Sequence, residues 1–182
     1  MKYTVPGIYT DEILTESSTV SQFLADSFPS PLMPATREDP GAPLRRARMQ
    51  FAIDTYNTKI SPFQMTLLKA PSAEKEAKVD ECVAAVKKEF EPLLADAGPF
   101  FGGSKELTFV ETQLAPFVLR LYAMSEDGEF IPRSLGEKLD GLPGWGKWAK
   151  AVMARESVLK IWDRETTLMG FKKKYGSMFE KV

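Results

Sequence analysis

The chain has 182 residues, of which 43% are hydrophobic and 27% charged, and its charges nearly cancel at a net of −1. This length suits one large domain or a small domain joined to a larger one, and the balanced charge gives no reason to expect a nucleic-acid partner, which requires a basic surface. The absence of histidine and the presence of one cysteine, Cys82, exclude a Ser-His-Asp triad and an intrachain disulfide, and we expect no metal site.

The first 43 residues predict a small unit followed by a linker. The segment "TVPGIYTDEILTES", residues 4–17, is typical of two short strands and a turn that lead into a helix. Helical spacing of Val20, Phe23, Leu24 and Phe28 predicts that this helix covers residues 17–27. Residues 29–43 contain five prolines and few apolar residues, which is linker composition. We therefore place a small first domain at 1–30, a Pro-rich linker at 31–43 and an all-helical domain at 44–182.

Two long helical patterns open the second domain. Residues 44–70 carry an apolar stripe that steps by three and four positions, and Pro62 predicts a bend near Ser61. Residues 72–97 carry a second stripe, with Cys82 on its flank. We expect Cys82 to be a small buried core residue.

The remaining sequence is also helical. Thr108 and Glu111 match a capping box at the start of a third long helix. Two faces of that helix are predicted: Val110, Leu114 and Leu121 face a core, whereas Gln113, Phe117 and Arg120 lie on a neighbouring face. An amphipathic run with Trp145 and Trp148 and a last helix over residues 163–175 follow, and the lysines at 172–174 are expected on its solvated face. The fold class is mainly α, with a helical bundle.

The series of features resembles the cytosolic glutathione transferase superfamily over residues 4–179. Val5-Pro6, Glu16-Ser17, the Pro-rich linker, two long helices, the capping box and a Trp-containing helix occur in that family's order. The stretch "FFGGSKELTFVETQLAPFVLRLYAM" is most similar to the omega branch and its fungal relatives, and "MQFAIDTYNTKI" to fungal enzymes of secondary metabolism. The resemblance implies an all-helical C-terminal domain preceded by a thioredoxin-like hairpin and helix.

The same resemblance implies a glutathione site. Pro6 would be a cis-proline, and the backbone of Val5 would pair with the cysteinyl part of glutathione like an added strand. Glu16 and Ser17 would hold the γ-glutamyl end, since the free N–H groups at a helix start favour a carboxylate. The alternative is that Pro6 only shapes a turn and Ser17 only caps a helix.

A hydrophobic second substrate is expected between the domains. The resemblance to the omega branch places Phe117, Arg120, Leu168 and Tyr175 around that cleft, with Phe51 and Thr55 as another wall. Arg120 and Tyr175 are candidates for stabilising the glutathione thiolate, Tyr3 is a weaker one, and the catalytic residue is not identified. The alternative places Phe117 in the core and pairs Arg120 with a surface carboxylate.

The pattern departs from the family before Val5. Family members carry a further strand-helix-strand-helix there, with the residue that activates the sulfur, whereas only Met1, Lys2 and Tyr3 precede Thr4. The thioredoxin-like domain is expected to be half present, unless the chain is a shortened version of a longer protein. A two-stranded hairpin is marginal alone, so we expect a homodimer that covers its edge.

The predicted function is a glutathione-dependent enzyme that acts on a hydrophobic electrophile or conjugated alkene. It would conjugate glutathione or isomerise a double bond by reversible thiol addition, in fungal secondary metabolism. The alternative is a non-catalytic scaffold of the same fold. The lone cysteine fits a reducing compartment, and no apolar run approaches the ~18 residues of a membrane span; the expected location is the cytoplasm, without a membrane partner.

Overall fold

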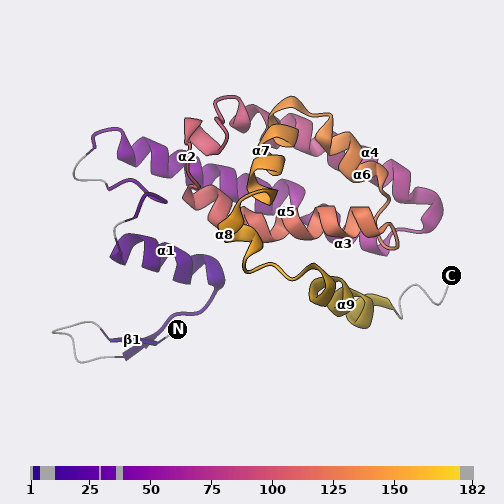
Figure 1. Ribbon diagram of the computed structural model, residues 1–182, viewed down its shortest axis with the longest axis horizontal. Coiled ribbons are helices and arrows are strands. Elements are labelled where there is room, and N and C mark those ends of the chain that lie inside the picture. Colours follow the sequence, from indigo (N-terminus) through magenta and orange to yellow (C-terminus); the bar gives the residue numbers. More distant parts are fainter. Residues whose placement is uncertain (1, 5–10, 29, 36–38, 177–182) are drawn as a thin grey trace.

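The computed structural model describes residues 2–4, 11–28, 30–35 and 39–176. Within them the only sheet is an antiparallel pair, β1 (Lys2–Thr4) and β2 (Asp11–Ile13), in which Lys2 lies opposite Ile13. Helix α1 (Ser17–Ser27) follows, with the bounds expected from the spacing of its apolar residues. Figure 1 shows this hairpin and α1 at one end of the molecule, below α2.

The rest of the described chain is helical. Its α-helices are α2 (Ala42–Thr55), α3 (Pro62–Lys69), α4 (Lys75–Ala85), α5 (Phe109–Asp127), α6 (Ser134–Asp140), α7 (Pro143–Met153), α8 (Glu156–Leu159) and α9 (Arg164–Tyr175). A π-helical segment, Tyr56–Ile60, joins α2 to α3 and ends directly before Ser61. The break falls where Pro62 predicted it, because proline lacks the N–H that would continue the helical bonding.

A second π-helical segment, Val86–Phe90, and a 3₁₀ turn, Glu91–Leu94, extend α4. The predicted second long helix is therefore present, but it is made of three kinds of helical turn. Short 3₁₀ turns also cover Ser72–Glu74 and Phe101–Gly103. No helix among the described residues is both long and apolar enough to cross a membrane.

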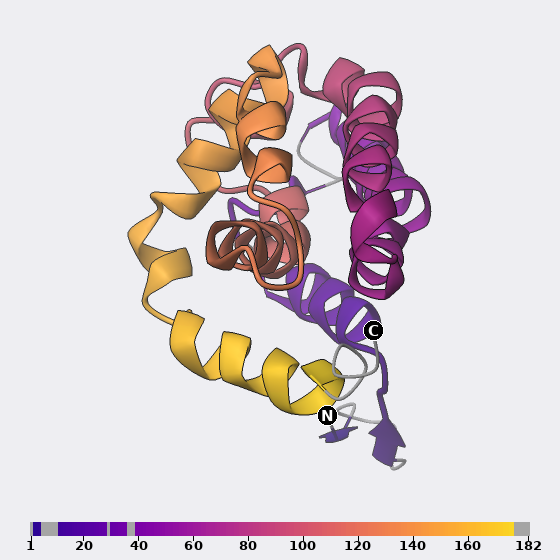
Figure 2. The ribbon, with the colours of Figure 1, turned by 90° about the vertical axis from the view of Figure 1, so that its right-hand side faces the viewer.

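Helix α5 is the central element. It packs against α2, α6, α7 and α9, and Figure 2 shows it nearly end-on between the α4 side and the α6–α7 side. Twelve of its side chains are buried, which explains why the bundle forms around it. Helix α9 contacts α5 but extends beyond the bundle at the lower right of Figure 1.

Aromatic rings form the middle of the core. Tyr56, Phe90, Trp145 and Trp148 are all buried. Their ring centroids lie between 5.5 and 6.3 Å apart in the pairs that touch. Two of these residues come from the π-helical segments and two from α7, so the cluster ties the two long helical stretches to the Trp-containing helix.

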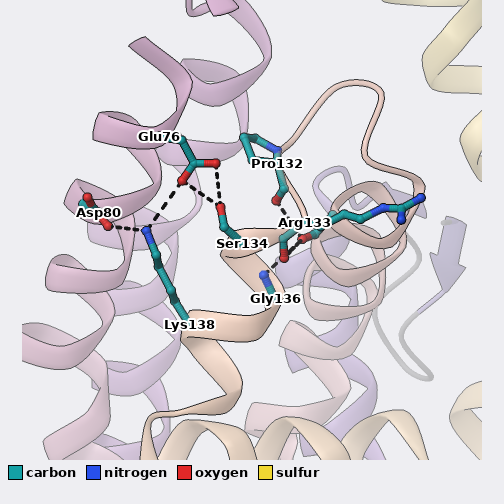
Figure 3. A network of polar contacts seen from close by, with 8 residues as sticks. Glu76, Asp80, Pro132, Arg133, Ser134, Gly136 and Lys138 are labelled. Atoms are coloured by element: carbon teal, nitrogen blue, oxygen red, sulfur yellow. Dashed lines mark hydrogen bonds and ion pairs between the residues drawn. The ribbon is translucent and has the colours of Figure 1, made fainter. Parts of the chain in front are cut away.

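Polar contacts hold α6 against α4. The Lys138 Nζ lies 2.6 Å from an oxygen of Asp80 and 3.6 Å from an oxygen of Glu76, and the Ser134 hydroxyl donates to Glu76. Figure 3 shows these contacts between the two helices. On the far side of α6 the Gly136 N–H donates to the Ser125 hydroxyl, which itself donates to the Pro132 carbonyl. Both faces of this short helix are thus fixed.

Helix α1 is tied to the bundle mainly by side chains. Arg46 of α2 forms an ion pair with Asp26 of α1, and the Gln22 amide lies 3.5 Å from the sulfur of Met33. Ala25 packs against the core. The main chain after α1 is anchored as well, because the Phe109 N–H donates to the Leu32 carbonyl at 2.9 Å.

Candidate functional site

The residue before α1 has an unusual backbone. Glu16, the N-cap, has φ 63° and ψ 123° and is the only residue other than glycine with positive φ in the described part of the chain. Such a conformation costs of order 1–3 kcal/mol and concentrates at functional sites. Its carbonyl accepts the first helical bond, from the Val20 N–H at 3.0 Å, so the strained residue directly sets where the helix begins.

The start of α1 is open. No side chain caps the helix, and Glu16, Ser17, Ser18 and Thr19 are exposed. The alternative in which Ser17 only caps the helix is not supported, because Glu16 occupies the N-cap position and Ser17 begins the helix itself. The remaining N–H groups of this turn are available to an anion. Val5 and Pro6, predicted to complete this corner, lie outside the described residues.

A cavity of about 450 Å³ lies beside the first turns of α1. Its walls come from α1, α2 and α5 and from Leu14, and include Ser18, Gln22, Gln50, Ile53 and Gln113. The residue next to Ser17 therefore borders a space of the size that small-molecule sites have, which begins at about 300 Å³.

A second cavity, of about 430 Å³, lies between α3, α5 and α9, and we call it the α9 cavity. Arg120 of α5 and Tyr175 of α9 both line it, 55 positions apart in the sequence. Its other walls are Ser61, Gln64 and Met65 near α3, and Thr166, Thr167, Gly170, Phe171 and Lys174 of α9. The structure thus brings together two of the residues predicted for the second-substrate site.

The Arg120 guanidinium stacks on an aromatic ring, and it forms no ion pair with a carboxylate among the described residues. Its Cζ lies 4.8 Å from the centroid of Phe117, one turn earlier in α5, which is the geometry of a cation–π contact. Its Nε is buried and has no hydrogen-bond partner within the described structure. The alternative that Arg120 pairs with a surface carboxylate finds no support among the described ion pairs.

Burial is the main influence on the pKa of Arg120. Loss of water lowers the pKa of its guanidinium, and Tyr56 and Tyr175 oppose this fall. An arginine nevertheless keeps its proton in proteins, so the α9 cavity contains a cation at neutral pH. Burial also raises the pKa of the Tyr56 phenol, which keeps that neighbour neutral.

The sequence did not single out Lys174 as a cavity residue. Lys172 of the same run lies 3.5 Å from Asp127, whereas Lys174 lines the α9 cavity and its Nζ lies 5.2 Å from the Tyr175 ring. The available signal was position: Lys174 lies one turn beyond Gly170 and Phe171, and residues so spaced share one face of a helix.

The other predicted cleft residues are placed apart from the α9 cavity. Phe117 is half-buried beneath Arg120 and its ring lies 5.9 Å from that of Tyr56. Leu168 and Thr55 are buried. Phe51 is 61% exposed on α2, because it lies on the side of that helix opposite to Met49 and Ile53.

Two further ionisable groups are fully enclosed. Cys82 is buried, and burial raises the pKa of its thiol to about 12, so it is no nucleophile at neutral pH. Glu111 completes the predicted capping box with Thr108. Its carboxylate also accepts from the Phe101 N–H at 2.9 Å and from the Trp148 indole at 2.7 Å. Both residues serve the fold.

The chemistry available in the α9 cavity is stabilisation of negative charge. The cavity presents a guanidinium, a lysine amine and a phenol, with the thioether of Met65 and the ring of Phe171 as apolar surface. No aspartate or glutamate lines it among the described residues. It can bind an anion or lower the energy of an anion that forms there.

The known proteins similar to this chain in the comparisons are named as glutathione transferases. No family model matches the chain. A probable glutathione S-transferase, GSTU1 of Oryza sativa subsp. japonica, is 28% identical over 172 aligned residues, which cover 90% of this chain and 71% of that protein. The crystal structure of glutathione transferase Omega 1C from Trametes versicolor has a TM-score of 0.75 at 22% identity, over 97% of this chain and 73% of that one.

A further solved structure is rice GST1 (OsGSTU1) in complex with glutathione, with a TM-score of 0.67 and 25% identity, over 92% of this chain and 72% of that one. The predicted mainly α fold of this class is thereby confirmed. In both sequence and fold, the chain is therefore similar to glutathione transferases.

Proposed function

We propose that the protein is a glutathione-dependent enzyme that transfers or adds the glutathione sulfur to a hydrophobic electrophile. Its relatives are named as glutathione S-transferases, and one of them is solved in complex with glutathione. These matches support the transferase role, whereas the substrate and the type of reaction rest on the geometry of this chain.

The observation that carries the proposal is the strained Glu16 at the open start of α1. In the proposed complex the γ-glutamyl carboxylate binds the free N–H groups near Ser17, and the Glu16 carboxylate accepts the ammonium. Val5, next to Pro6, supplies backbone hydrogen bonds to the cysteinyl part. A strained backbone and an uncapped helix are costs that a bound ligand offsets.

The second substrate is proposed to occupy the α9 cavity. Arg120 and Tyr175 would stabilise the glutathione thiolate or the charge that it passes on. A free thiol has a pKa of about 8.5, so only a few per cent is thiolate at neutral pH, and each pKa unit of lowering requires about 1.4 kcal/mol of preferential interaction with the anion. Phe117 lies beneath Arg120 and would support it in the proposed site. Leu168 and Thr55 are buried and Phe51 is exposed on α2, apart from the α9 cavity.

Two reactions use the same first step. In conjugation the thiolate forms a C–S bond with the electrophilic carbon, and the electron pair leaves with a leaving group or is protonated. In isomerisation the thiolate adds to the β-carbon of an enone, the π electrons move to the carbonyl oxygen, and the resulting single bond rotates. The enolate then re-forms the double bond and expels the thiolate, so glutathione is not consumed.

One assay separates these reactions. The protein is incubated with glutathione and a cis-enone, and free thiol is measured beside the isomer ratio. Falling thiol supports conjugation, and constant thiol with a changing isomer ratio supports isomerisation. If both stay constant and millimolar glutathione leaves the melting temperature unchanged, the enzymatic proposal fails and a scaffold role replaces it, because a ligand that binds the folded state raises its stability.

A homodimer is the proposed assembly. Large apolar side chains are exposed at the hairpin end of the molecule: Ile13, Leu24, Phe28, Leu44 and Phe51. A second copy would cover them together with the hairpin edge. Light scattering tests this, with a dimer expected for the wild-type chain and a lower mass for Phe51→Ser. The proposed domains (1–30 and 44–182), the cytoplasmic location and the fungal secondary-metabolite setting complete this proposal.

A further inference from the structure

We propose that the α9 cavity selects, among hydrophobic second substrates, those that carry a carboxylate, and that Arg120 is the residue that binds the acid. This inference rests on the proposed function, because it names the substrate class of the same site. It goes beyond that function in predicting a preference for organic acids over neutral molecules of the same shape.

The first argument is the unmet bonding capacity of Arg120. Buried polar groups in native proteins have hydrogen-bond partners in the large majority of cases, and each exception requires an explanation. The buried Nε of Arg120 has none among the described residues, and its guanidinium lies on the Phe117 ring. A guanidinium presents a planar fork that matches a carboxylate with two parallel hydrogen bonds.

The second argument is the sign of the charge around the cavity. Lys174 lines the cavity and has no carboxylate partner in the described ion pairs, unlike Lys172. No acidic side chain among the described residues lines the walls. Lys174 is itself exposed. Two cations that border one cavity without a carboxylate partner among the described residues favour an anionic occupant.

The third argument is the shape and polarity of the rest of the cavity. Its volume of about 430 Å³ is within the range of small-molecule sites. Met65 and Phe171 supply apolar surface, and a side chain on Gly170 would meet nothing within 4 Å. An amphipathic acid fits this combination, with its carboxylate at Arg120 and its apolar body along α9.

Glutathione itself carries two carboxylates, so it is a second possible source of the anion at Arg120. The experiment therefore measures the acid and glutathione separately. Isothermal titration calorimetry without glutathione compares 4-phenylbutyrate with the neutral 4-phenylbutyramide. Wild-type protein is expected to bind the acid at least about tenfold more tightly, the factor that a hydrogen-bonded charge contributes.

Three variants connect this difference to the cavity. Arg120→Met keeps an apolar stem over Phe117 without the charge and is expected to remove the preference for the acid. Gly170→Leu fills the open space and is expected to weaken both ligands, while glutathione still binds. Arg48→Met is the matched control: Arg48 also lies over a phenylalanine, Phe101 at 5.7 Å, but it pairs with Asp96 and does not line the α9 cavity. It is expected to bind like the wild type.

The proposal is overturned if the acid and the amide bind equally, or if Arg120→Met retains the preference. It is also overturned if Arg120→Met weakens S-methylglutathione, which keeps both carboxylates but has no thiolate, as strongly as the acid, because the cavity then takes a carboxylate of glutathione. If Arg120→Met does not fold, the other two variants are used. Loss of acid binding in Gly170→Leu together with unchanged acid binding in Arg48→Met supports the α9 cavity as the binding site, and unchanged acid binding in Gly170→Leu overturns it. Acid binding with no glutathione binding by wild type supports this inference and contradicts the proposed function.

Discussion

Two charged residues of helix α5, one buried and one half-buried, differ in their hydrogen bonds. Glu111, at its first turn, is fully buried and accepts from Phe101, Thr108 and Trp148. Arg120, nine residues later, has a buried Nε without any partner among the described residues. One carboxylate is saturated by the protein's own donors, and one guanidinium still has donors free.

The difference separates a structural charge from a functional one. A buried group with all its bonds made can stabilise the fold, whereas a buried group with bonds unmade costs stability until a ligand binds. The two residues should therefore respond differently to mutation: Glu111 through the free energy of unfolding, and Arg120 through binding.

The largest effect is expected at Glu111. Glu111→Ala leaves four buried donors without their acceptor: the N–H groups of Phe101 and Thr108, the Thr108 hydroxyl and the indole of Trp148. We expect the free energy of unfolding to fall by at least about 3 kcal/mol, since each unsatisfied buried donor costs 1–3. Urea denaturation measures it. The control is Glu106→Ala, an exposed partner of Arg155, with a loss of under about 1 kcal/mol. Equal losses would contradict the structural role.

Arg120→Met should show the reverse. Removing an unpaired, partly buried charge relieves its desolvation while the contact with Phe117 is weakened, so the free energy of unfolding should stay within about 1 kcal/mol of wild type. Glutathione-dependent turnover of a carboxylate-bearing electrophile should drop about tenfold or more. A large loss of stability with unchanged turnover would mean that Arg120 is structural and would remove the contrast with Glu111.

The sequence was sufficient for the elements whose cause is local. The α1 bounds, the break at Ser61 and the capping box of Thr108 and Glu111 follow from spacing, proline and capping chemistry. The π-helical turns at 56–60 and 86–90 could not be foreseen, since they fit Tyr56 and Phe90 into a cluster with the two tryptophans of α7.

The site was accessible only in part. Arg120 and Tyr175 were foreseen by resemblance and do meet in one cavity. Lys174 was missed as a cavity residue, because a run of three lysines is typical of a solvated face. All three are exposed, and only the docking of α9 shows that Lys174 also lines the α9 cavity. Phe51 is exposed on α2, since the facing of a residue beside an apolar stripe depends on how the helix is rotated against its neighbours.

The strained backbone at Glu16 also separates stability from binding, as Glu111 and Arg120 do. Glu16→Gly should raise the free energy of unfolding by up to about 1 kcal/mol, because glycine adopts positive φ without a steric penalty, partly offset by its larger chain entropy. The affinity for glutathione should fall with the lost carboxylate. The control is Ser18→Gly in the first turn of α1, which should destabilise by about 0.5–1 kcal/mol. Stability unaltered in both variants would argue against strain at Glu16.

The smallest effect is expected at Cys82, where burial is the one influence on the pKa of the thiol. Its thiol pKa is raised to about 12 by burial, whereas the unfolded value is near 8.5. Below pH 8 the thiol is neutral in both states, and stability is lost as the pH rises from there toward 12, because only the unfolded chain gives up the proton.

Between pH 7 and pH 9 the wild type should therefore lose about 0.8 kcal/mol more of its free energy of unfolding than Cys82→Ala does. Urea denaturation of both chains at the two pH values measures the difference. A thiol reagent such as Ellman's should react with Cys82 at pH 8 only after unfolding, since the folded thiol is enclosed and protonated. Rapid reaction in the folded state would contradict the burial of Cys82. It would show that solvent and small molecules reach the core beside α4, as they reach Arg120 in the α9 cavity.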